Sequence, residues 1–66
     1  MFILFGDRRI NLELIKQYKP LEKSSSYLIE LIYLDGSKED LYFFDRKDER
    51  NEYLDKLDKN LLINLS

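Results

Sequence analysis

A chain of 66 residues is too short for two domains, and its apolar fraction of 44% is too large for a disordered polypeptide. The sequence has no cysteine and no histidine, which excludes disulfides, thiolate zinc sites and thiol nucleophiles. Its net charge of -2 gives neither the strong basic field of a nucleic-acid-binding protein nor an acidic tail. We therefore expect one domain over residues 1–66 that is stabilised by packing.

The N-terminal part of the sequence predicts two short strands joined by a hairpin turn. Residues 2–5 form an apolar run that Gly6-Asp7 closes, and apolar residues then alternate with polar ones from residue 10 to residue 14. The alternation breaks at Ile15, which fits a bulge, a tight turn at Leu12 to Ile15 or a single helical turn.

The middle of the sequence predicts a loop and a second hairpin. Residues 19–26 contain the only proline and three consecutive serines, and this composition favours an exposed loop. Residues 27–34 are the longest β-like run, and Asp35-Gly36 after it is a strong hairpin signal, because type I′ turns need positive φ at both central positions. A fourth strand is expected over residues 38–44.

The last part of the sequence changes from a period of two to a helical period. A helix is expected over residues 46–59, with Asp45 capping its N-terminus and with Tyr53 and Leu57 on its apolar face. Residues 62–66 are expected to fray or to continue the helix. Together these elements predict an α+β fold, a four-stranded antiparallel β-meander with one C-terminal α-helix packed on one face.

The third and fourth predicted strands are apolar on both faces. Leu28 and Ile32 share one face of the third strand with Glu30 as its only charged residue, and the opposite face is also apolar. One helix covers only one face of such a sheet, and the polar loop over residues 19–26 covers the other face poorly. We therefore expect an intermolecular contact, most simply a twofold homodimer. The expected interface residues are Leu28, Ile32, Leu34 and Tyr42.

A second candidate surface is mildly basic. Residues 1–26 carry five basic and three acidic side chains, a net charge of +2, whereas residues 27–66 carry six basic and ten acidic ones, a net charge of -4. Basic residues between aromatic ones are typical of surfaces that bind single-stranded nucleic acid, with Tyr18 or Tyr27 as the stacking partner here. The candidate contacts are Arg8, Arg9, Lys16 and Lys19. The isoelectric point near 5.0 argues against this alternative.

No motif in the sequence predicts catalysis, a metal site or a cofactor. Asp45, Asp48 and Glu49 lack the spacing of a calcium-binding loop, and helix capping already explains Asp45. The three serines lack the glycines and the helix N-terminus of a phosphate loop. We therefore expect a protein that is not an enzyme.

The order of the predicted segments along the chain is a further feature of the sequence. A short apolar strand is followed by the alternating stretch over residues 10–15, by Asp35-Gly36-Ser37, by the aromatic strand over residues 41–44 and by a charged helix. This order resembles small uncharacterised ββββα proteins of low-GC bacteria and their phages. The resemblance implies the layout and carries no functional residue. The lack of Ala, Val, Thr and Trp also fits a genome with AT-rich codons.

Three classes of function follow as hypotheses. The first is a non-enzymatic protein-interaction module that self-associates and, if encoded by a phage, binds or inhibits a host protein. The second is a nucleic-acid-binding module, and the third is an oligomer that sequesters a small ligand such as a nucleotide. The apolar start of the chain is shorter than a signal peptide or a membrane span, so we expect a cytoplasmic protein in a bacterium or an infected host cell.

Overall fold

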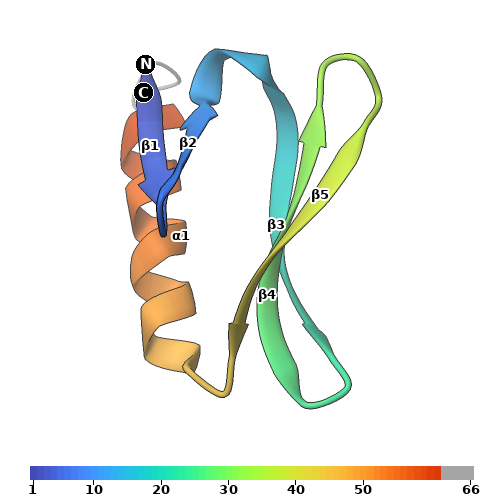
Figure 1. Ribbon diagram of the computed structural model, residues 1–66, viewed down its shortest axis with the longest axis vertical. Helices are drawn as coiled ribbons and strands as arrows, with labels where there is room; N and C mark the ends of the chain where they lie inside the picture. The colour runs from blue at the N-terminus through green and yellow to red at the C-terminus, as the bar shows by residue number, and fades with distance from the viewer. Residues whose placement is uncertain (62–66) are drawn as a thin grey trace.

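The computed structural model describes residues 1–61, which form two antiparallel sheets and one helix (Figure 1). In chain order the elements are β1 (Phe2–Phe5), β2 (Arg8–Asn11), a 3₁₀ turn η1 (Leu12–Leu14), β3 (Ile15–Lys23), β4 (Ser26–Tyr33), β5 (Lys38–Phe44) and α1 (Lys47–Leu61). β1 pairs with β2, and β3, β4 and β5 form a three-stranded sheet in that order. The expected fate of residues 62–66 lies outside the described residues.

The α+β class, the antiparallel pairing and the C-terminal helix are confirmed, but the strands form two sheets instead of one four-stranded meander. The chain breaks at η1, where the Asn11 side chain accepts a hydrogen bond from the Glu13 N–H at 3.1 Å. The Ile15 N–H closes this turn on the Leu12 carbonyl. The turn buries Leu12 in the core and separates β2 from β3. The turn expected at Leu12 to Ile15 is thus confirmed as a 3₁₀ turn, and the strand expected before it ends at Asn11, whose side chain caps the turn.

The loop expected over residues 19–26 is a strand for most of its length. β3 continues to Lys23 and pairs with β4 in an unbroken register from Gln17 onward. Pro20 is compatible with this strand because β3 lies at the edge of its sheet, where proline is tolerated. Pairing with the apolar β4 thus outweighs the loop-forming composition of this segment.

The β3–β4 connection is a two-residue turn made by Ser24 and Ser25. Their φ angles are 47° and 64°, which is the pattern of a type I′ turn with positive φ at both central positions. Asn and Gly are the usual residues in such a turn, and serine is not. The composition of this segment therefore carried no signal for a hairpin.

Ser25→Gly is expected to raise the free energy of unfolding by about 0.5–1 kcal/mol. The left-handed conformation is roughly 1–2 kcal/mol less favourable for a residue with a Cβ, and the greater freedom of glycine in the unfolded chain offsets part of the gain. Urea denaturation measures the change. Ser26→Gly is the matched control, because Ser26 begins β4 and should lose stability. Equal losses in both variants would show that the turn does not need positive φ at position 25.

Helix α1 begins at Lys47, where Arg46 and not Asp45 occupies the capping position. The Arg50 N–H donates to the Arg46 carbonyl at 3.1 Å, which is the first hydrogen bond of the helix. Asp48 in the first turn still complements the helix dipole. Within the described part of the chain, no helix is long and apolar enough to cross a membrane.

The core lies where the two sheets and the helix meet. In Figure 1, α1 and the β1–β2 hairpin lie together on one side, and the three-stranded sheet lies on the other. The core contains buried side chains from every layer: Ile10, Leu12, Ile29, Leu31, Leu41, Phe43, Tyr53 and Leu57. Phe5 joins them from the hairpin, with its ring centroid 5.3 Å from that of Phe43 and 5.6 Å from that of Tyr53. This aromatic cluster fixes the hairpin beside the larger sheet.

Candidate functional site

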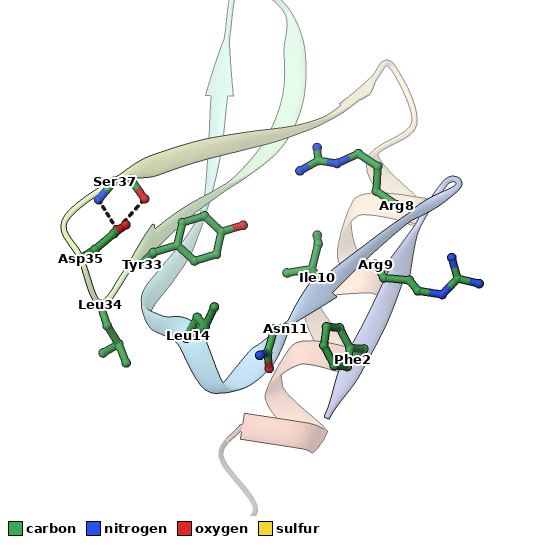
Figure 2. A pocket seen from close by; sticks show the side chains of 10 residues that line it. All are labelled: Phe2, Arg8, Arg9, Ile10, Asn11, Leu14, Tyr33, Leu34, Asp35 and Ser37. Atoms are coloured by element: carbon green, nitrogen blue, oxygen red, sulfur yellow. Dashed lines mark hydrogen bonds between the residues drawn. The ribbon is translucent and has the colours of Figure 1, made fainter.

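A groove of about 490 Å³ lies between strand β2 and the turn that joins β4 to β5 (Figure 2). Three large apolar side chains on its walls, Phe2, Leu14 and Leu34, are between 51% and 63% exposed. The other lining residues are Arg8, Arg9, Ile10, Asn11, Tyr33, Asp35 and Ser37. An open groove with exposed apolar side chains is the strongest candidate site in the described part of the chain.

The pairing of β1 with β2 explains why Phe2 is exposed. Ile3 and Phe5 point to the core, so the alternation of the strand turns Phe2 and Leu4 to the opposite face. Because β1 is apolar at all four positions, burying one face leaves the other apolar and exposed. The hairpin turn at Gly6, with φ of 63°, fixes this register.

The β4–β5 turn explains why Leu34 is exposed. The expected hairpin at Asp35-Gly36 is confirmed, but only Gly36 has positive φ, so the turn is not type I′. The Tyr33 N–H donates to the Ser37 carbonyl at 2.8 Å, which makes residues 34–36 a three-residue loop. Leu34 therefore belongs to the loop, and its side chain lies at the rim of the groove (Figure 2).

The side chains of Asp35 and Ser37 make this loop rigid. Asp35 Oδ1 accepts hydrogen bonds from the Ser37 N–H at 2.9 Å and from the Ser37 hydroxyl at 2.6 Å. These hydrogen bonds hold the pKa of Asp35 below its usual value. One wall of the groove is thus held in place by local hydrogen bonds.

A polar network of three side chains crosses one end of the groove. Arg8 forms an ion pair with Glu39 of β5, and the Tyr33 hydroxyl donates to Glu39 Oε1 at 2.6 Å. The hydrogen bond from Tyr33, followed by that from Arg8, lowers the pKa of Glu39 against the opposing effect of burial. Burial and the hydrogen bond to Glu39 raise the pKa of Tyr33 to about 12. The charge of Arg8 is therefore already compensated within the fold.

The raised pKa values of Tyr33 and Tyr53 predict a loss of stability in alkali. Each is near 12 in the folded protein against 10.0 for a free tyrosine, so the neutral side chain is favoured by folding. Stability should be unaffected below pH 10 and should fall as the pH rises toward 12, because the unfolded chain ionises first. The variant Tyr33→Phe should lose less stability than the unmodified chain over this pH range. Urea denaturation of the unmodified chain and of this variant across that pH range measures it, and an equally steep fall in both would contradict the prediction.

Arg9 differs from Arg8 in both direction and pairing. Figure 2 shows the Arg8 side chain pointing toward the larger sheet and the Arg9 side chain on the other face of β2. Arg9 is exposed and forms no ion pair with any side chain of residues 1–61. Among residues 1–61, Arg9 is thus a basic side chain of the groove without an ion-pair partner, and the Asp35 carboxylate in the same lining also forms no ion pair.

Of the four residues expected at a protein interface, three lie on the outer face of the larger sheet, where Leu28 is paired with Tyr42 and Ile32 lies on the same side of β4, but not all of them are exposed. Leu28 is 0% exposed, so it adds nothing to the surface of the monomer, and Ile32 is partly buried. Tyr42 is exposed and stacks on Phe44, with ring centroids 6.1 Å apart. Leu34 is the member of the set that lines the groove.

The outer face of the larger sheet is more polar than the sequence pattern suggested. Across its centre, Lys19, Glu30 and Asp40 occupy neighbouring register positions. Lys19 Nζ lies 3.8 Å from Glu30 Oε1, and Asp40 pairs with Lys23 at 3.7 Å. A charged row therefore separates the apolar side chains at the two ends of this face. Strand β3, which the sequence analysis placed in a loop, supplies its lysines.

The four basic residues expected to contact nucleic acid lie on two different strands. Arg8 and Arg9 line the groove on β2, whereas Lys16 and Lys19 belong to β3. The tyrosines proposed as stacking partners are also engaged within the fold. The Tyr18 hydroxyl donates to Asp58 Oδ1 at 2.7 Å, and the Tyr27 ring has Arg50 Cζ 5.4 Å from its centroid. The structure brings together the arginine pair and Leu34, which the sequence analysis assigned to different surfaces.

Phe2 and Leu14 are groove residues that the sequence analysis missed. A signal for Phe2 was present, since residues 2–5 are apolar without interruption and both faces of such a strand cannot be buried by one core. The sequence contained no comparable signal for Leu14. Its side chain is exposed because the turn η1 directs Leu12, and not Leu14, into the core.

Within residues 1–61, no three acidic side chains lie close enough together to hold a metal ion. Comparisons with models of protein families, with curated proteins and with solved structures found no match. The function therefore has to be argued from the groove and its surroundings.

Proposed function

We propose that this protein is a small protein-interaction module that binds a partner polypeptide in the groove between β2 and the β4–β5 turn. The observation that carries the proposal is the convergence of Phe2, Leu14 and Leu34, which come from a strand, a 3₁₀ turn and a loop. Their exposed side chains adjoin Arg9, Asp35 and other polar groups. Apolar side chains within a polar rim are typical of surfaces that bind proteins.

The groove has more support as an interface than the outer face of the larger sheet. Leu28 is buried there, and the row of Lys19, Glu30 and Asp40 crosses the middle of the face. A homodimer through that face would have to desolvate these charges, which is unfavourable unless each gains a partner. Contact through the groove does not require charges to be desolvated at Phe2, Leu14 or Leu34. This holds for a homodimer and for a complex with a different protein.

Photo-crosslinking in the producing cell tests the proposal. A photo-reactive phenylalanine analogue is placed at Leu34 in one variant and at Lys59, an exposed position of α1 that does not line the groove, in a control variant. We expect a discrete covalent adduct from position 34 and none from position 59. An adduct of twice the mass of the 8.0 kDa chain identifies self-association, and any other mass identifies a different partner.

A third variant with the analogue at Phe2 repeats the test from the opposite wall of the groove. The same adduct from positions 2 and 34 supports a partner seated between them. No discrete adduct from either position, or the same adducts from position 59, would contradict the proposal. Circular dichroism of each purified variant confirms that the fold is retained.

A further inference from the structure

The backbone of β2 has hydrogen-bonding groups that point away from β1. The Leu12 N–H donates to the Met1 carbonyl at 2.9 Å, which extends the β1–β2 pairing by one residue pair. Bonded and non-bonded pairs alternate in an antiparallel ladder, so Ile3 and Ile10 exchange hydrogen bonds and Leu4 and Arg9 do not. The N–H and C=O groups of Arg9 and the N–H of Asn11 are therefore directed to the free edge of β2, whereas the Asn11 carbonyl, at the N-cap of η1, accepts the first hydrogen bond of that turn.

The free edge of β2 opens into the groove. β2 has one neighbour in its sheet, and within residues 1–61 no backbone hydrogen bond to Arg9 is formed from any other element. All four residues of β2 line the groove. A four-residue strand is about 13 Å long, so the edge can pair with an extended segment of about four residues. Edge strands of this kind are common templates for strand addition by another chain.

Strand β3 is another edge strand, and its sequence protects it against pairing with another chain. β3 carries Pro20, which has no N–H to donate, and charged side chains at Lys16, Lys19, Glu22 and Lys23. Proline and lysine on an edge strand are features that oppose pairing with another chain. β2 has no proline, and its two charged residues are arginines, which oppose pairing with a basic segment but not with an acidic one.

The side chains beside the β2 edge define the chemistry of the added segment. A residue that faces inward would contact Ile10 and Tyr33 on the floor of the groove and should be apolar. A residue that faces outward would lie beside Arg9, whose charge has no partner in the described fold, and should be acidic. Alternating acidic and apolar residues in the partner satisfy both faces.

A second copy of β2 does not fit this requirement. β2 contains Arg8 and Arg9 and no acidic residue, so pairing it with itself supplies no carboxylate in any register. Such pairing would gather four arginines in one short sheet, and like charges on neighbouring strands are destabilising. Self-association by pairing of two β2 strands is therefore unfavourable, and a segment of a different protein fits this edge better.

From these observations we infer that the groove binds an extended, alternating acidic and apolar segment of another protein, which adds to β2 as a third strand. This inference rests on the proposed function and specifies the partner class. The N–H and C=O of Arg9 and the N–H of Asn11 supply the hydrogen bonds, and the Arg9 guanidinium selects the acidic residues.

The test uses a fluorescent hexapeptide that alternates glutamate and isoleucine, with blocked ends, and fluorescence anisotropy. We expect saturable binding to the full chain and no binding of the matching peptide with lysine in place of glutamate. Arg9→Glu should weaken binding by about tenfold or more through loss of attraction and added repulsion. Lys16→Glu makes the same charge change on β3, outside the groove, and should weaken binding far less.

N-methylated peptides then separate strand addition from docking by side chains alone. Methylation of the isoleucine amides and methylation of the glutamate amides block opposite edges of the extended peptide. We expect one series to abolish binding and the other to retain it, because only one edge pairs with β2. Equal binding by both series would overturn strand addition and leave the groove as a docking site.

The inferred partner class is overturned if the unmethylated peptide does not bind at concentrations up to about 1 mM. A dissociation constant of about 1 mM corresponds to a binding free energy of about 4 kcal/mol. Crosslinking from positions 2 and 34 in that case would still support the proposed function. If the crosslinks are absent as well, the proposed function fails together with the inference.

Discussion

Phe43→Ala is expected to lower the free energy of unfolding by about 3–5 kcal/mol. Phe43 is 6% exposed and contacts Phe5 edge to face, with Tyr53 also 5.6 Å away between ring centroids. It thus connects the larger sheet, the hairpin and the helix. A domain of this length has a total stability of roughly 3–10 kcal/mol, so the variant should be near or below the limit of folding.

Phe44→Ala is the matched control for this prediction. Phe44 follows directly in the sequence, but it is 59% exposed and its ring stacks on Tyr42 at the surface. We expect it to lose less than about 1 kcal/mol, as most surface substitutions do. Urea denaturation measured by circular dichroism gives both values. A larger loss for Phe44→Ala than for Phe43→Ala would show that the two side chains are on the opposite faces from those described.

Arg50→Ala is expected to lower the free energy of unfolding by about 2–3 kcal/mol. Arg50 is 9% exposed, and its guanidinium donates to the Leu21 carbonyl at 3.1 Å and to the Leu28 carbonyl at 3.4 Å. Its Cζ also lies 5.4 Å from the centroid of the Tyr27 ring. Hydrogen bonds to a charged group contribute about 1.5–3 kcal/mol, and the buried aliphatic part of the side chain adds to this.

Arg46→Ala is the control for Arg50, because Arg46 lies one helical turn earlier and its side chain is half exposed. Its ion pair with Glu49 at 3.3 Å is screened by water, so the expected loss is below about 1 kcal/mol. Thermal denaturation of the two variants under one buffer condition compares them. Equal losses would contradict the account of Arg50 as the contact that fixes α1 against β3 and β4.

The strands and the helix were largely predictable because they depend on local patterns. The period of the apolar residues located β1, β4, β5 and α1, and Asp35-Gly36 marked a real hairpin. The Ser24-Ser25 turn was not predictable, because neither serine favours positive φ by itself. Pairing with β4 imposes that conformation, and it also converts the expected loop into β3.

The groove was harder to predict because its walls come from segments that are distant in sequence. Phe2 and Leu34 line the same groove only after the hairpin has packed beside the larger sheet. The exposure of Leu34 depends on the loop having three residues instead of two. Arg50 shows the same limit in the core, since a charged helical residue is usually solvated and here donates to two strands.

The central claim is that the β2 edge is open in the free protein and is closed by a bound partner. Residue-specific amide hydrogen exchange tests it most directly. In the free protein the Ile10 amide should exchange slowly, because it is bonded to Ile3, and the Arg9 amide should exchange rapidly. Addition of the alternating glutamate and isoleucine peptide should protect Arg9 and leave Ile10 unchanged. Slow exchange at Arg9 in the free protein, or rapid exchange there with the peptide bound, would contradict the account.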